Sequence, residues 1–209
     1  MKTLKQSLLI LAFATTLFAC KKDKDKVDEL AKQEILQKKI ADIIPKEYQD
    51  SLVKMGIVIN QDVTPPKLDG AYILKVLKLV KSNVPTDVAN KTFANLEIKF
   101  FGQDSDNNIQ LISRSGTGNQ FTTDTSIVTA ISGSGKQFTV YGKTKSVSGS
   151  NVAIFGVIYS GEIDGNVLRN VKTGLINIDN SKGGTTFIKQ GQGRVIRDDD
   201  LISESIPMF

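Results

Sequence analysis

The chain has 209 residues, with 27 Lys and Arg against 22 Asp and Glu, one cysteine, and no histidine or tryptophan. Without histidine there can be no Ser-His-Asp triad, Cys-His dyad or imidazole metal ligand, and one cysteine excludes an intrachain disulfide and a Cys-rich zinc site. The net charge of +5 is not gathered into a basic patch with interleaved aromatic residues, so we expect no nucleic-acid partner.

Residues 1–19 have the parts of a bacterial export signal. A lysine-bearing start is followed by an apolar segment at 8–18, which is too short to cross a bilayer of about 30 Å as a stable helix. The segment ends in Leu-Phe-Ala-Cys at 17–20, which resembles the lipobox of bacterial lipoproteins. That resemblance implies cleavage before Cys20, acylation of Cys20 and anchoring in a membrane. The alternative is an ordinary signal peptide that happens to end at a cysteine.

Residues 20–26 alternate lysine and aspartate after the cysteine and predict a flexible tether. We expect the protein to be anchored in the outer membrane. Some lipoproteins that reach the cell surface have an acidic stretch just after the cysteine. Here lysine comes first and aspartate only alternates with it, so whether the protein faces the periplasm or the cell surface is left open.

Residues 27–64 predict a short helical neck and a linker. Apolar residues recur at helical spacing over 27–44, and Pro45 ends that helix or begins the next. The next short helix is predicted to end at Gly56, where a glycine can adopt the left-handed conformation. The apolar stripe serves either as a spacer or partner-binding helix, or packs on the main domain. Packing is favoured because isolated helices this short are marginal in water.

Residues 65–209 predict an antiparallel β domain. Runs rich in Val, Ile, Thr, Phe and Tyr alternate with turn clusters of Gly, Asn, Asp and Ser, and the connections are too short for parallel crossovers. We predict an up-and-down barrel of about eight strands, with a β-sandwich as the alternative. The predicted strands are 70–76, 94–102, 108–114, 119–132, 136–147, 151–161, 166–178 and 184–196, with 77–93 as a longer connection.

The two ends of this domain carry a family resemblance. Gly70-Ala71-Tyr72 opens the first strand after a helical entry and a Pro-rich turn, and Arg194 follows two glycines in the last predicted strand. The arrangement is similar to lipocalin-like (calycin) barrels, in which Gly-x-Trp opens the first strand and a late Arg packs on that ring. It also looks like small Gram-negative outer-membrane lipoproteins with lipocalin-like folds. The resemblance implies that Gly70, Tyr72 and Arg194 close one barrel end, with Arg194 stacked on Tyr72.

Two strands are apolar on both faces, at 153–159 and 175–178. Such strands are either covered on the outside or line a cavity, and an eight-stranded barrel can hold one small ligand. For each candidate wall residue the alternative is ordinary core packing. The candidate wall residues are Phe100, Phe138, Ile154, Phe155 and Tyr159.

The acidic residues predict neither a metal site nor an acid pair for catalysis. The consecutive Asp198, Asp199 and Asp200 lie beside arginines and predict a solvated turn rather than a calcium site. A glycosidase needs two inward acids, whereas alternation places Glu97 on the polar face of its strand. We therefore predict no cofactor and no enzymatic activity. The expected function is binding of a small, mainly apolar ligand. The alternative is a structural or interaction module for glycan or protein in an outer-membrane complex, and a hydrolase ranks below both.

Overall fold

The computed structural model describes residues 27–117 and 120–209, of which residues 27–43 are helical. The chain divides into two compact units, Met1–Ile35 and Leu36–Phe209. The predicted signal peptide, the lipidation site Cys20 and the tether lie outside the described residues. The second unit contains the whole β structure and is described below.

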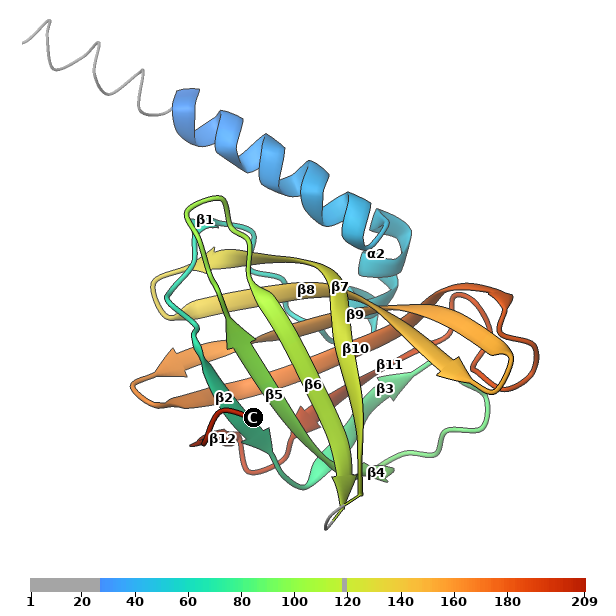
Figure 1. Ribbon diagram of the computed structural model, residues 1–209. Helices are drawn as coiled ribbons and strands as arrows, with labels where there is room; N and C mark the ends of the chain where they lie inside the picture. Colours follow the sequence, from blue (N-terminus) through green and yellow to red (C-terminus); the bar gives the residue numbers. More distant parts are fainter. Residues whose placement is uncertain (1–26, 118–119) are drawn as a thin grey trace, which may run out of the picture. The chain divides into compact units, whose positions relative to one another are not determined.

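The second unit is a closed antiparallel barrel of eight strands (Figure 1). The barrel prediction is therefore confirmed, and the sandwich alternative is not adopted. The elements after the first helix are α2 (Lys46–Lys54), β1 (Val63–Thr64), β2 (Gly70–Leu74), β3 (Leu77–Ser82), β4 (Thr92–Phe93), β5 (Asn95–Phe101), β6 (Gln110–Thr117), β7 (Gln120–Ser134), β8 (Gln137–Ser148), β9 (Asn151–Asp164), β10 (Val167–Lys182), β11 (Gly193–Asp198) and β12 (Ile202–Ile206).

The barrel closes because its first and last strands are each interrupted and pair with each other. β2 and β3 together form the first strand, and β11 and β12 form the last. β12 pairs with β2 and β11 pairs with β3, both antiparallel, while β10 pairs with β11 and β12 on the other side. Between β2 and β10 each strand pairs with the next through β5, β6, β7, β8 and β9. Closure leaves the barrel strands without a long free edge.

The first and last strands differ from the predicted bounds. Residues 77–82 form β3, although we expected a connection from 77 onward. The predicted strand 184–196 begins only at Gly193, and the chain before it is a loop. In both cases the strand is defined by pairing between β3 and β11, which are far apart in the sequence. Local composition does not reveal such a pairing.

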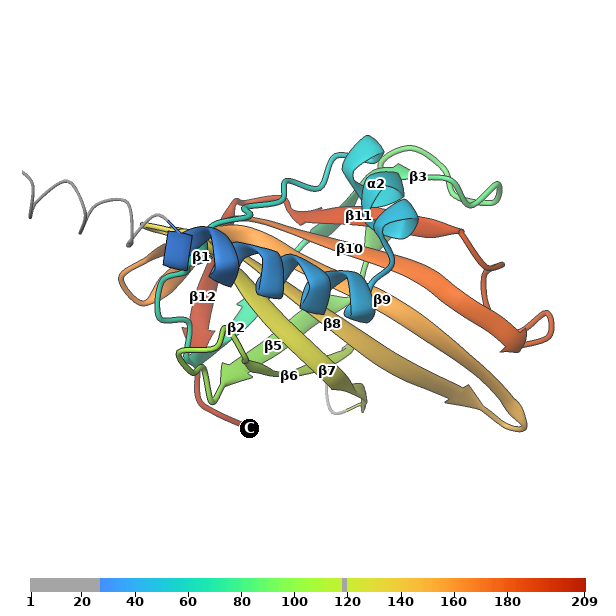
Figure 2. The same cartoon turned by 90° about the horizontal axis from the view of Figure 1, so that it is seen from above.

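Residues 36–57 pack on the outer face of the barrel. Figure 2 shows α2 beside β10 and β11, and its Leu52 is fully buried. The packed-helix interpretation is confirmed for this stretch. The helical segment covers the outer faces of β9 and β10. This explains why the runs 153–159 and 175–178 are apolar on both faces of their strands. The contact forms a hydrophobic core outside the barrel, here called the second core to distinguish it from the core inside the barrel. It joins Leu36, Ile40, Ile43, Ile44, Leu52, Met55 and Ile57 to Ala130, Tyr141, Ile158, Ile176 and Val195.

Two glycines let the helical segment approach the strands closely. A Cβ atom at Gly156 would lie 3.1 Å from the side chain of Ile44, and one at Gly174 would lie 3.1 Å from Leu52. Contacts this short would force the side chains of Ile44 and Leu52 to shift by a few tenths of an ångström. The helical segment therefore depends on small residues in β9 and β10 as well as on its own apolar stripe.

The helix α2 ends at a left-handed glycine, Gly56, as predicted from the sequence. Gly56 has φ of 104°. Its N–H donates to the Val53 carbonyl, and the Ile57 N–H donates to the Leu52 carbonyl at 3.1 Å. These bonds form a Schellman motif, in which a left-handed glycine ends the helix. Ile57 is itself buried in the second core, so the turn directs the chain back onto the barrel.

Candidate functional site

One end of the barrel interior is a packed apolar core. Phe100 lies at its centre, with ring centroids 6.4 Å from Tyr72, 6.3 Å from Phe138 and 5.9 Å from Tyr159. Leu68, from the segment before β2, is fully buried in the same cluster. Phe100 and Phe138 are both fully buried, and neither belongs to the cavity described next. Their place in the core corrects the prediction that they are wall residues, because large side chains from facing strands fill this end.

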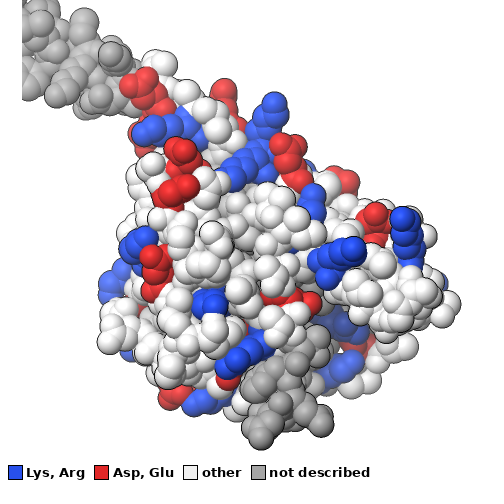
Figure 3. All heavy atoms as spheres, viewed as in Figure 1, with Lys and Arg blue, Asp and Glu red and all other residues white. Residues whose placement is uncertain are grey.

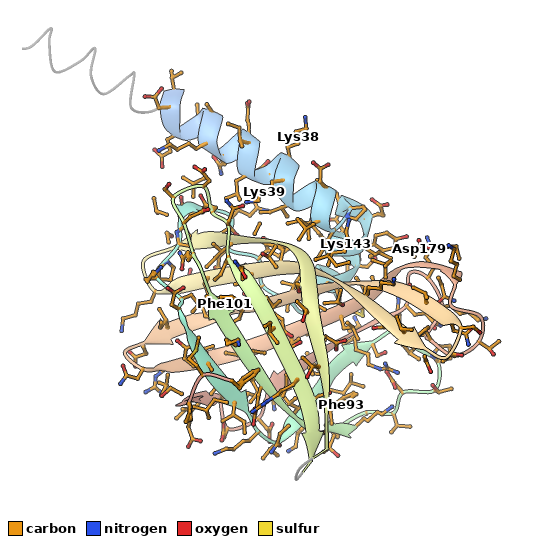
Figure 4. The ribbon with its side chains drawn as sticks, viewed as in Figure 1. Lys38, Lys39, Phe93, Phe101, Lys143 and Asp179 are labelled. Atoms are coloured by element: carbon orange, nitrogen blue, oxygen red, sulfur yellow. The ribbon has the colours of Figure 1, made fainter. Side chains whose placement is uncertain are left out.

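The other end of the barrel interior contains a cavity of about 410 Å³. Its walls come from strands around the whole barrel, with Phe93 of β4 at this end (Figure 4). The apolar lining consists of Leu77, Phe93, Ala94, Leu96, Phe155, Val157, Leu175, Phe187 and Ile196. The polar lining consists of Ser113, Ser115, Asp124, Thr144, Ser146, Tyr159 and Thr173. A site of this size that combines apolar walls with a few polar groups is typical of small-molecule binding.

The β9 strand shows which predicted wall residues reach the cavity. Phe155 and Tyr159 line it, with Val157 between them. Ile154 has the opposite parity, like Ile158, which packs beneath the helices. Ile154 therefore belongs to the outer face, because successive side chains of a strand point to opposite sides. The apolar run over 153–159 concealed this alternation.

Among the described residues that line the cavity, Asp124 alone has a carboxylate or a basic group. Its carboxylate forms no hydrogen bond or ion pair with any residue whose side chain the structure describes. Burial raises the pKa of the Asp124 carboxyl above its ordinary value, because desolvation disfavours the charged form. A carboxyl group thus lies in a largely apolar cavity without a basic partner among the described side chains.

Tyr159 lies at the boundary between the cavity and the core. It is close enough to Asp124 for the Asp124 charge to affect the pKa of its phenol. The pKa of the Tyr159 phenol is raised to about 12, because burial and, to a smaller extent, the Asp124 charge raise it by more than a hydrogen bond with Ser113 lowers it. The phenol is therefore neutral at physiological pH. It serves as a hydrogen-bonding group and not as a base.

Thr173 places a second unpaired polar group at the cavity wall. Its side chain is only 5% exposed, and its Oγ1 has no hydrogen-bond partner in the described part of the chain. Buried hydroxyls usually have a partner, and each exception calls for an explanation. Together, Asp124 and Thr173 give the cavity two polar groups that the described side chains leave unused.

Asp124 was missed in the sequence because a bulge changes the phase of β7. The register with β8 shifts between Ser126 and Val128. Asp124 lines the cavity before the bulge, and Ile131 lies in the inner core after it. Simple alternation cannot place both on one face, since an odd number of positions separates them. The Ser113 and Ser115 pair in β6 was the available signal, as small polar residues at alternate positions.

Arg194 holds the loop between β3 and β4 and does not close the barrel on Tyr72. Its Nη2 donates to Asp87 Oδ1 at 3.1 Å, and Lys91 pairs with the same carboxylate at 2.8 Å. Asp87 is 1% exposed, and the Arg194 guanidinium beside it holds the pKa of its carboxyl well below its usual range. This ion pair replaces the predicted stacking contact.

The register explains the correction. Arg194 lies opposite Ser82 at the end of β3, whereas Tyr72 lies opposite Ser205 in β12. The residues therefore stand at different ends of the interrupted first strand. Tyr72 and Gly70 remain at the packed end, where the Tyr72 ring folds back against Gly70, within 2.8 Å of where a Cβ would stand.

The described residues include neither a cluster of metal ligands nor a helix that could span a membrane. No group of three His, Cys, Asp or Glu side chains within 27–117 and 120–209 lies close enough to hold a metal ion. In the same ranges, no helix combines the length and apolar character required to cross a membrane. Figure 3 shows acidic and basic side chains interspersed on the visible face. No family model, curated protein or solved structure matches the chain, so the cavity is the basis for assigning a function.

Proposed function

We propose that this chain is a lipid-anchored protein of the bacterial outer membrane whose barrel binds a small, mainly apolar molecule without converting it chemically. The observation that carries the proposal is the cavity of about 410 Å³ inside a closed barrel. Small-molecule sites have volumes of roughly 300–1,000 Å³ and are mostly apolar with a few polar groups. The cavity meets both criteria.

The apolar lining supplies the binding energy in this proposal. Phe155 and Phe187 pack edge to face with ring centroids 6.0 Å apart, and both line the cavity. A ligand against these rings would remove apolar surface from water, worth about 25 cal/mol per Å² before the entropic cost of binding. Most of the lining belongs to paired strands, with Phe187 contributed by the loop between β10 and β11, so little ordering is required when the ligand enters.

The membrane anchor rests on the sequence around Cys20. The lipobox-like tetrapeptide supports acylation at this residue, and each buried acyl CH₂ contributes about 0.8 kcal/mol to membrane binding. Mass spectrometry of the mature protein from a Gram-negative host should show an acylated N-terminal cysteine. The Cys20→Ser variant should lack the modification and leave the membrane fraction. An unmodified wild-type chain would refute the anchor.

Native mass spectrometry of the mature protein from envelope extracts tests ligand binding. We expect the wild type to carry a discrete extra mass that organic extraction removes. Ser146→Trp would place an indole in the cavity, whereas Lys145→Trp adds the same ring at the exposed neighbouring position. The extra mass should vanish in the first variant and persist in the second. If the wild type carries none and takes up no apolar molecule, the interaction-module alternative replaces this proposal.

A further inference from the structure

The charge distribution of the cavity indicates the kind of ligand, if the proposed binding function holds. Of the lining residues that the structure describes, Asp124 alone is formally charged. The basic groups at the loop between β3 and β4 already have a partner, since Lys91 of this loop and Arg194 of β11 both pair with Asp87. On the neighbouring strands, Lys143 and Lys172 donate instead to the carbonyls of Asp42 and Gly56. The described residues thus leave the Asp124 carboxylate without a cation.

A buried carboxylate is costly unless it is paired or hydrogen-bonded. The Asp124 carboxylate has no such partner among the described side chains. An apolar ligand without a donor would bury the carboxylate further and leave it unpaired, and an anionic ligand would repel it. A ligand with a positive charge would convert this cost into a charge-assisted hydrogen bond.

The hydroxyls around the cavity favour an ammonium group with N–H donors. Thr173 Oγ1 is buried, unpartnered and part of the lining, and it can accept a hydrogen bond. A protonated amine carries N–H donors that can serve Asp124 and a hydroxyl acceptor together. The lining offers a single carboxylate and no basic partner for a ligand carboxylate, so it suits a monoamine rather than a polyamine or an amino acid.

We propose that the ligand is a small organic ammonium ion, whose nitrogen pairs with Asp124 and Thr173 and whose apolar body packs against Phe155 and Phe187. This inference rests on the proposed binding function and specifies its ligand class. Asp124 supplies charge selection, Thr173 supplies the second acceptor, and the two rings supply the apolar contact. No bond is made or broken in the ligand.

The test compares matched probes on the mature, full-length protein in detergent micelles by ligand-observed NMR titration at neutral pH. The probes are phenethylamine, which is cationic, phenethyl alcohol, which is neutral, and hydrocinnamate, which is anionic. We expect phenethylamine to bind about tenfold more tightly than phenethyl alcohol, and hydrocinnamate to bind most weakly. Partition into the micelle is common to all variants and therefore cancels in their comparison.

The key variant is Asp124→Asn, which keeps the shape of the side chain and removes its charge. It should abolish the preference for the amine while phenethyl alcohol still binds. Asp179→Asn is the matched control, because it removes the same charge from the exposed end of β10 (Figure 4), and it should preserve the preference. Thr173→Val should weaken phenethylamine several-fold without changing phenethyl alcohol. This variant provides an independent test if Asp124→Asn fails to fold.

The possible results distinguish failure of the ammonium-ligand inference from failure of the proposed binding function on which it rests. Equal affinities for the amine and the alcohol, both abolished by Ser146→Trp, would overturn the ammonium ligand and leave the binding cavity intact. Preferential binding of hydrocinnamate would do the same. If no probe binds in a manner sensitive to Ser146→Trp, both proposals fail.

Discussion

The two ends of the barrel interior are formed by the same strands but have opposite contents. At one end, Phe100 is enclosed by three other aromatic rings, and at the other a cavity of about 410 Å³ lies beside Phe155. The change occurs along single strands. In β6, Leu111 belongs to the core while Ser113 and Ser115 line the cavity.

The β8 strand shows the same transition. Its inward residues are Phe138 and Val140 at the packed end, and Thr144 and Ser146 at the hollow end. Gly142 lies between them, and a Cβ there would lie 2.6 Å from Ser126 Oγ. Small polar side chains thus take the place of large apolar ones where the cavity lies. The strands remain paired along both ends, with a register shift between β7 and β8 at Ser126 and Val128.

The largest expected difference between the two ends is in the free energy of unfolding lost when one phenylalanine at each end is replaced by alanine. Phe100→Ala should lower the free energy of unfolding by about 3–5 kcal/mol, because it opens a void inside a filled core. Phe155→Ala should cost less, about 1–2 kcal/mol, because one side of the ring already faces a cavity and supplies fewer packing contacts. Urea unfolding followed by circular dichroism measures both. Equal losses would contradict the difference in packing between the two ends.

A second comparison concerns two acids with raised pKa values, the partly buried Asp124 in the hollow end and Asp198 at the end of β11. Asp198 is fully buried. Its Oδ2 accepts a hydrogen bond from Ser203 at 2.8 Å, but its Oδ1 has no partner in the described residues. Desolvation raises the pKa of Asp198 from 3.8 to about 6. The folded state therefore holds this proton more tightly than the unfolded state does.

Because the folded pKa is the higher one, this group destabilises the fold as pH rises from about 4 to 6, by about 3 kcal/mol in total. Asp198→Asn should remove that pH dependence and raise the free energy of unfolding at pH 8 by about 2–3 kcal/mol. Unfolding curves at several pH values test it. A variant that is less stable at pH 8 would show that the charged form of Asp198 is needed.

The loop at the hollow end should show a smaller, more local effect. The pKa of Asp87 lies below its ordinary value because Arg194, Lys91 and Ser82 stabilise the charged form, so its contribution is present above about pH 4 and is lost in more acidic solution. Asp87→Asn should cost about 2 kcal/mol at pH 7, since Arg194 keeps partial access to water. Hydrogen exchange should accelerate in residues 83–91 and not in the packed end. Uniform acceleration would contradict a local role.

Much of the barrel could be predicted because its information is local. The strand predicted at 94–102 is β5, Asn95–Phe101, and the one predicted at 151–161 is β9, Asn151–Asp164. Alternating side chains and turn residues define such hairpins within a few positions. Gly56 was likewise recognisable, because a helix ending in the left-handed conformation favours glycine.

The candidate site was less predictable, because it depends on which residues face inward. The apolar run over 153–159 made Ile154 and Phe155 equivalent candidates, although only Phe155 lines the cavity. The bulge between Ser126 and Val128 concealed Asp124. Arg194 was assigned to Tyr72, but its partner Asp87 comes from a loop distant in sequence.

The sequence by itself determined the antiparallel hairpins, the helical stripe of residues 36–57 and the turn at Gly56, because periodicity and left-handed glycines act over a few residues. Only the tertiary structure decided how the first and last strands pair, which way the bulged strand faces, and where the interior is filled or hollow. These properties depend on contacts between residues far apart in the chain. The lone carboxylate in the cavity follows from such contacts, because its position is set by the closure and register of the whole barrel.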